Sequence, residues 1–401
     1  MDKAAIRTLR EKYEDNLFNS VVPFWERYSL DRENGGYYSC LERDGTVFDT
    51  DKFAWMQTRE IWTFAKLYNR RDAADEARRR QWLELARSGT EFLKKHGRAP
   101  SGDLYFSVDR AGLPLVEPYN IFAEYFFAAG LAEFHRASKE QWAREMAESV
   151  YRRAMERKPN PKGIWTKQIG KNRPIKAMGS AMMDIWLAGE MEGIIGEAEL
   201  NGLIDAAENQ IFTLHVDRKE KAVFERVLSD GTHLLSCMEG RLLNPGHALE
   251  TLWFLMLAVA KRGEQRKVED IADIMLWCAE RGWDEKYGGF FYYQDFKGFP
   301  TEKLESDMKL WWVHAEALCA FLLAYKLTGR KEHLEWFTRV DEYIFSHFVD
   351  PEYGEWYGYL DRRGEPAFTL KGGKWKGFFH TPRALMACID WLKEMERNCA
   401  E

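Results

Sequence analysis

The sequence predicts an all-α fold, an (α/α)6 barrel in which six helical hairpins close into a ring. Apolar residues recur at helical spacing in twelve stretches. Long connectors of similar composition separate successive helix pairs, which makes an internal repeat of about sixty residues. Because an open array would expose its end repeats and a closed ring buries them all, we expect residues 1–401 to form one barrel domain.

The helical stretches follow one another with short turns inside each pair. Because the connectors enter them, the stretches beginning near 53, 119, 176, 245, 308 and 382 are expected to form the inner ring. In chain order the predicted helices span 3–28, 53–70, 73–96, 119–136, 138–157, 176–191, 194–213, 245–261, 264–281, 308–328, 330–348 and 382–397.

The long connectors combine acidic turns, glycines and aromatic residues with strand propensity. Three are closely alike: "DRENGGYYSCLERDG" from 31, "WDEKYGGFFYYQDFKG" from 283 and "DPEYGEWYGYLDRRG" from 350. Such segments predict short β-hairpins. Ordered connectors of this length are usually functional, so we expect them to crowd one mouth of the barrel, with the reactive residues where the inner helices begin.

Composition excludes several classes of function. The formal net charge of -6, with both signs interspersed, provides no basic surface for nucleic acid. No apolar run is long enough for a membrane helix, and the charged N-terminus lacks the apolar block of a secretory signal, so we expect a cytoplasmic protein. The six cysteines include no CxxC pair, which favours buried free thiols over disulfides.

The segment "NPGHALE" places a histidine where an inner helix begins. Asn244 is a good N-cap and Pro245 suits the first helical position, so His247 lies in the first turn. The helix dipole there disfavours a cation, and we expect a neutral imidazole that can act as a base. Glu250 shares its helical face and can orient the ring or a bound hydroxyl. The alternative is a histidine satisfied by the backbone.

The segment "KGFFHTPRALM" repeats the arrangement at the last inner helix. We expect Thr381 to be the cap, Pro382 to begin the helix, His380 to stand just before the cap and Arg383 to lie in the first turn. Two histidines at separate inner-helix entries can face each other across one pocket.

The segment "DMKLWWVHAEAL" carries a polar stripe of Lys309, Trp312 and Glu316. If that stripe faces the lumen, Glu316 can bind sugar hydroxyls; the alternative is a packed ion pair. His314, on the other stripe, is expected in the core.

The segment "KFAWMQTREIW" places Arg59 between Trp55 and Trp62 on one helical face. This arginine can stabilise negative charge on a bound oxygen, or it can be a structural cation stacked on the rings.

The sequence contains no series of cysteines and histidines at metal-ligand spacing, and no HExxH, Walker A, GxGxxG or GxSxG motif. The chemistry should therefore come from acid and base side chains, without a metal or cofactor. Aromatic-rich loops around carboxylates and an arginine suit a polyhydroxylated ligand. Two imidazoles on opposite sides of a sugar can remove and return a proton at the carbon beside its carbonyl, because the reference pKa of histidine lies near neutrality.

The motifs "GRLLNPGHALETLWFLM", "MKLWWVHAEAL", "DPEYGEWYGYL", "KGGKWKGFFHTPRALM" and "KFAWMQTREIW" closely resemble the N-acylglucosamine 2-epimerase (renin-binding protein) family. The resemblance extends from the first helix to the last. It implies an (α/α)6 barrel that interconverts N-acylglucosamine and N-acylmannosamine, no required cofactor, modulation of some members by nucleotides such as ATP, and frequent homodimers.

By the same resemblance, His247 and His380 are the catalytic pair, and Arg59, Glu250 and Glu316 bind substrate. The residues themselves add Trp55, Trp312 and Arg383 to the predicted sugar pocket.

Three alternatives stay open. The first is a mannose, glucose or cellobiose 2-epimerase or an aldose–ketose isomerase of the same superfamily. The second is a glycoside hydrolase that uses Glu250 and Glu316. The third is a non-catalytic interaction protein.

Overall fold

The computed structural model describes residues 1–70 and 74–399, and every predicted helix is found there. The predicted start of one helix at residue 73 lies outside the described residues, and that helix is described from Glu76. The helices are α1 Lys3–Asp15, which continues through a π-helical turn into α2 Val22–Tyr28, α3 Ala54–Asn69, α4 Glu76–His96, α5 Phe122–Ser138, α6 Gln141–Arg157, α7 Met178–Glu190, α8 Glu197–Gln210, the short α9 Met238–Arg241, α10 Pro245–Lys261, α11 Gln265–Gly282, α12 Trp311–Thr328, α13 Lys331–Tyr343 and α14 His380–Asn398.

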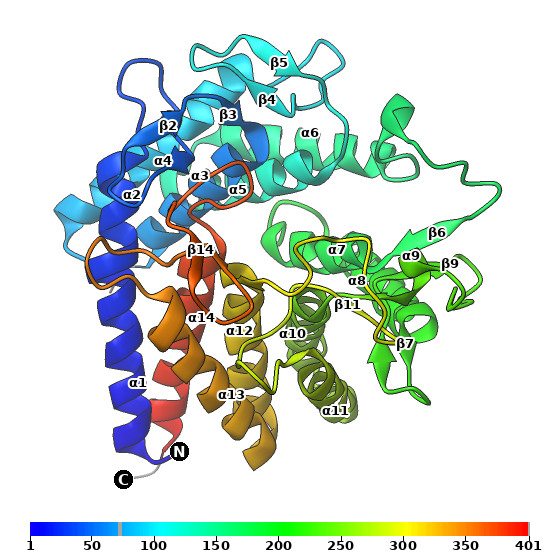
Figure 1. Cartoon of the computed structure of the whole chain (residues 1–401). Helices are drawn as coiled ribbons and strands as arrows, with labels where there is room; N and C mark the ends of the chain where they lie inside the picture. The colour runs from blue at the N-terminus through cyan, green and yellow to red at the C-terminus, as the bar shows by residue number, and fades with distance from the viewer. Residues whose placement is uncertain (71–73, 400–401) are drawn as a thin grey trace.

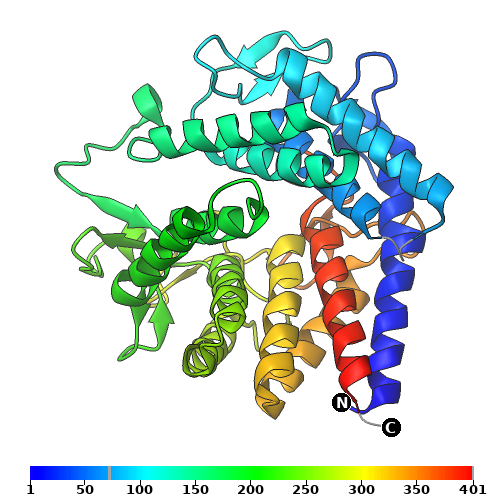
Figure 2. The same ribbon diagram turned by 180° about the vertical axis from the view of Figure 1, so that it is seen from behind.

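The helices form two concentric layers (Figures 1 and 2). Helices α3, α5, α7, α10, α12 and α14 pack in that order and form the inner ring, as predicted. Each outer helix packs mainly on the inner helix before it in the chain, and α1 packs on α14. The first and last helices therefore lie side by side and bring the two termini to the same end (Figures 1 and 2).

The inner helices are apolar around most of their circumference because both faces are covered. In α12, every residue from Trp311 to Ala324 is buried. Outer helices such as α11 and α13 instead bury one stripe and expose charged residues on the other side. The contrast explains why one layer surrounds the lumen and the other faces water.

Short antiparallel strands link neighbouring helix pairs at one mouth. A strand that precedes an inner helix pairs with a strand of a later connector, and this pairing fixes where the helix begins. The pairs are β3 Lys52–Phe53 with β4 Ser107–Val108, β6 Ile175–Ala177 with β9 Arg226–Leu228, β10 Leu242–Leu243 with β11 Gln294–Asp295, and β12 Lys309–Leu310 with β13 Tyr359–Leu360. The remaining strands are β1 Cys40–Leu41 and β2 Val47–Asp49, β5 Pro114–Val116, β7 Val216–Asp217 and β8 Ala222–Val223, and β14 Pro366–Phe368.

Each of the three similar connectors has a buried aspartate that pairs with a buried lysine. Asp350 binds Lys371 (2.8 Å) and Arg43 (2.7 Å), so the last connector is held to the first hairpin where the ring closes. Corresponding interactions join Asp31 to Lys52 and Arg110, and Asp284 to Lys309 and Arg362. The prediction that Lys309 faces the lumen is wrong, because its ammonium group lies in this structural ion pair.

Two expectations from composition are also met. All six cysteines are free, and four of them are buried. None of the helices in the described ranges has the length and apolar character needed to cross a membrane.

Candidate active site

His247 lies in the first turn of α10, as predicted. The Asn244 side chain caps the helix by accepting a hydrogen bond from the His247 backbone N–H (3.1 Å), and Pro245 is in the first turn. The imidazole Nδ1 lies 3.1 Å from both carboxylate oxygens of Glu225, which precedes β9. This contact fixes the ring and leaves Nε2 for chemistry.

The direction of the pKa shift expected for His247 is wrong. Burial opposes a charged ring, but the carboxylates of Glu225, Glu250 and Glu316 raise its pKa above the usual value. The helix dipole is therefore outweighed by nearby negative charge. Glu225 was not anticipated because it lies 22 residues before His247 and only the pairing of β6 with β9 brings it to this mouth. In the sequence, Glu225 stands out only as a carboxylate among apolar residues in a connector between two predicted helices.

His380 begins α14, two residues before the expected start at Pro382. Phe379 is the N-cap residue and Thr381 lies inside the helix, so the prediction that Thr381 is the cap is wrong. Pro382 is tolerated because first-turn N–H groups need no partner within the helix. His380 Nδ1 lies 2.7 Å from a Glu316 oxygen. Burial, followed by the charges of Arg59 and Arg383, lowers the pKa of His380 well below its usual value.

Arg383 joins the carboxylates of the site. Its Nη2 donates to Glu250 and, at 2.6 Å, to Glu316, and all three side chains are buried. Trp253 Nε1 donates to the second Glu316 oxygen at 2.9 Å. Glu250 therefore binds Arg383, and the expectation that it orients the His247 ring is wrong.

Glu250, Glu316 and His380 place ligand atoms within 4.8 Å of one another, which is a spacing suited to a metal ion. The Arg383 guanidinium already contributes a cation between these two carboxylates.

Arg59 is a buried cation whose neighbours are aromatic. Its guanidinium lies over the rings of Trp55 (4.5 Å), Phe126 (4.1 Å) and Phe379 (4.9 Å). Its Nε is buried without a hydrogen-bond partner in the described part of the chain. Burial lowers the pKa of Arg59 to about 9, against the opposing effect of Glu250. Of the two tryptophans predicted to flank it, Trp55 does so.

Trp62 has a different environment from the one expected. Its indole donates to Glu190 at 2.8 Å and its ring lies edge-on to Phe379. His314 is a core residue, as predicted: it is fully buried, with its two ring nitrogens bound to backbone groups of Leu310 and Phe290.

Both site histidines lie close to Trp312. Its ring centroid is 5.2 Å from that of His247 and 5.8 Å from that of His380. The two imidazole centroids are therefore no more than 11.0 Å apart, the total of these distances. His247 also contributes to the lowered pKa of His380. The Trp312 indole therefore forms an apolar wall beside both imidazoles.

Comparisons with known proteins agree with this architecture. Residues 36–384 match the family model described as N-acylglucosamine 2-epimerase (GlcNAc 2-epimerase). The chain is 37% identical to N-acylglucosamine 2-epimerase of Bos taurus, over 98% of this chain and 93% of that protein. It is also 37% identical to the Homo sapiens protein of that name, over 98% and 92%.

A solved structure of cellobiose 2-epimerase from Bacillus thermoamylovorans has the same fold. It superimposes with a TM-score of 0.80 at 23% identity and covers 96% of this chain and 99% of that one. The family match extends across both histidines, Arg59 and both buried glutamates of the site. The chain belongs to the N-acylglucosamine 2-epimerase family.

Proposed function

We propose that the protein is a cofactor-independent sugar 2-epimerase that interconverts N-acylglucosamine and N-acylmannosamine. The observation that carries the proposal is the placement of two imidazoles, each bound through Nδ1 to its own glutamate, close to the same indole ring of Trp312. The names of relatives at 37% identity over nearly the whole chain support the acylated substrate.

The two histidines divide the proton transfers. His380, whose pKa is lowered, rests neutral; its Nδ1–H donates to Glu316, and its Nε2 lone pair takes the hydrogen from the sugar carbon beside the aldehyde. The electron pair of that C–H bond moves into an enolate. His247, whose pKa is raised, is the acid of the pair and returns a proton to the opposite face. The carbon is inverted, and the two rings have exchanged protonation states.

Arg59 stabilises the enolate. Its guanidinium stands in an aromatic, largely dehydrated environment with an unused N–H, so a developing oxyanion is a partner that the resting site lacks. Trp55 and Trp312 offer flat surfaces to the sugar. Arg383 fixes Glu250 and Glu316, and through Glu316 it fixes His380.

The arrangement disfavours a glycoside hydrolase. That chemistry needs one carboxyl group that is free to act as a general acid and a second that acts as base or nucleophile. Glu250 and Glu316 instead both bind the same buried guanidinium of Arg383, and Glu316 also accepts from Trp253. Neither carboxyl group is therefore free for these two roles.

The test is proton NMR in heavy water with N-acetylmannosamine and with mannose. The proposal predicts that the acylated sugar is epimerised and gains deuterium at the carbon beside its carbonyl. A chain that turns over mannose and leaves N-acetylmannosamine unchanged is instead a free-sugar epimerase or isomerase. Release of reducing ends from an oligosaccharide would identify a hydrolase.

The family also leads us to propose a cytoplasmic homodimer that needs no cofactor and responds to nucleotides such as ATP. Light scattering measures the oligomeric state, and initial rates with and without ATP measure the response. Binding to a protein partner with no turnover of any sugar would favour the interaction-protein alternative.

A further inference from the structure

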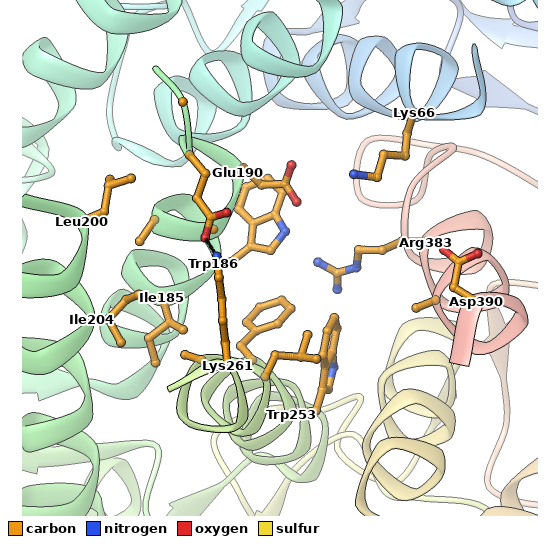
Figure 3. Close-up of a pocket in the computed structure, with 18 of the residues that line it drawn as sticks. Lys66, Ile185, Trp186, Glu190, Leu200, Ile204, Trp253, Lys261, Arg383 and Asp390 are labelled. Carbon is orange, nitrogen blue, oxygen red and sulfur yellow. Dashed lines mark hydrogen bonds and ion pairs between the residues drawn. The ribbon is translucent and has the colours of Figure 1, made fainter. Parts of the chain in front are cut away.

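A cavity lies at the end of the inner helices that is opposite the histidines. It has a volume of about 790 Å³, and its walls come from the C-terminal halves of α3, α7 and α10, from α14 and from α8. Figure 3 shows the side-chain nitrogens of Lys66 and Arg383 directed into this space, with Trp186 and Trp253 beside it. The volume is that of a small-molecule site.

Four tryptophans line the cavity: Trp62, Trp186, Trp253 and Trp391. The indole N–H groups of Trp62 and Trp253 are used by Glu190 and Glu316. Those of Trp186 and Trp391 have no acceptor among the residues that the structure describes, although both side chains are largely buried. Flat rings beside unused donors suit a ligand with apolar faces and polar edges.

The charges in the wall are already compensated. Lys66 is 3.5 Å from Glu133, Arg70 binds Asp390, and Arg383 binds Glu316. At the rim, Lys261 binds Glu192 and Arg262 binds Asp205. Because each cation already has an anionic partner, the cavity provides little net attraction for a phosphate or carboxylate ligand. The chemistry favours a neutral polyhydroxylated molecule.

We propose that this cavity is a second binding site for a neutral sugar, at the end of the barrel opposite the histidine mouth. The sugar would stack on the tryptophans and hydrogen-bond to the free indole N–H groups and the carboxylate edges, such as the second oxygen of Glu190.

The site is coupled to the catalytic mouth through a shared wall. Trp253 lines the cavity and donates to Glu316, which accepts from His380. A sugar on Trp253 therefore acts on the group that orients His380, and this part of the proposal rests on the proposed function. Because coupling between sites is reciprocal, sugar in one site changes affinity in the other.

The test blocks the cavity by Gly189→Phe. Gly189 lines the cavity on α7, and a Cβ there meets no heavy atom within 4 Å. Gly202→Phe is the matched control: Gly202 is an exposed glycine of α8 with equally open space and no place in the cavity wall. Circular dichroism verifies that both variants retain the helical fold.

Equilibrium dialysis against methyl N-acetyl-β-glucosaminide measures the binding stoichiometry. This glycoside has no free aldehyde and is not turned over. We expect G189F to bind one equivalent fewer than the wild type and G202F. Equal stoichiometry in all three proteins overturns the proposal, and so does displacement of the cavity-bound equivalent by ATP, which would assign an anionic ligand.

The same titration separates this proposal from the proposed function. If the wild type binds one equivalent and G189F none, the cavity site stands, the mouth does not bind this closed glycoside, and the heavy-water NMR test alone decides the proposed function. If the coupling holds, initial rates of the wild type and G202F deviate from a hyperbola at high N-acetylmannosamine, and those of G189F do not. Hyperbolic kinetics in all three proteins overturns the coupling.

Discussion

Replacing Arg59 by Met should make the protein more stable and far less active. Arg59 is 8% exposed, and burial lowers its pKa from the ordinary value of arginine to about 9. The folded state thus holds this proton less tightly than the unfolded chain. Converted at about 1.4 kcal/mol per tenfold change in affinity, the burial costs up to about 5 kcal/mol at neutral pH. Stability recovers only as the pH rises above about 9 towards the ordinary pKa of arginine.

Methionine removes this cost and keeps a similar volume, although it loses the cation–π contacts with Trp55, Phe126 and Phe379, which contribute about 2 kcal/mol in total. We therefore expect R59M to be about 2–3 kcal/mol more stable in urea unfolding at pH 7. The loss of a group that stabilises the oxyanion should lower kcat by about 10²–10³.

The control is Arg80→Met, since Arg80 is an exposed residue of α4 paired with Glu76. It should change stability by no more than about 0.5 kcal/mol and leave kcat unchanged. The urea midpoint and the NMR rate are measured on the same preparations. An R59M protein that is less stable than the wild type, or one that retains its full rate, would refute the reasoning.

Three further predictions concern stability and pH. Glu225→Gln removes the charge that raises the pKa of His247, so the alkaline limb of the kcat/KM profile should move to lower pH; an unmoved limb would show that His247 is not the acid. Asn244→Ala removes the α10 cap and should cost about 1 kcal/mol in urea unfolding, whereas an unchanged midpoint would contradict that role. Asp350→Asn leaves Lys371 without its buried partner, and a loss of about 3–5 kcal/mol is expected; a melting temperature equal to that of the wild type would exclude this account of ring closure.

The helices and the place of the site could be read from the sequence because both depend on local patterns. The repeated apolar helical stretches predict the ring, and the long aromatic connectors predict that the reactive residues lie at one mouth of it. Asn244 and Pro245 fix the start of α10 through backbone chemistry alone. The start of α14 was less predictable, because its N-cap residue, Phe379, makes no side-chain hydrogen bond that caps the helix.

Partners across the ring could not be read in this way. The contact of His247 with Glu225 depends on strands that lie in different connectors, and the contact of Arg383 with Glu316 depends on how α12 and α14 pack. The pKa of His247 is raised and that of His380 is lowered because of these contacts. From the sequence alone, both imidazoles had the same expected pKa, and the acid and the base therefore could not be assigned.

The most direct test of the two-histidine account follows hydrogen exchange and inversion separately, by NMR in heavy water, in His247→Asn and His380→Asn. Each variant should lose inversion by at least about 10², and each should still exchange the hydrogen of one epimer through the remaining imidazole, with opposite epimers for the two variants. Full inversion by either variant, or inversion by the wild type without solvent deuterium at that carbon, would contradict the account.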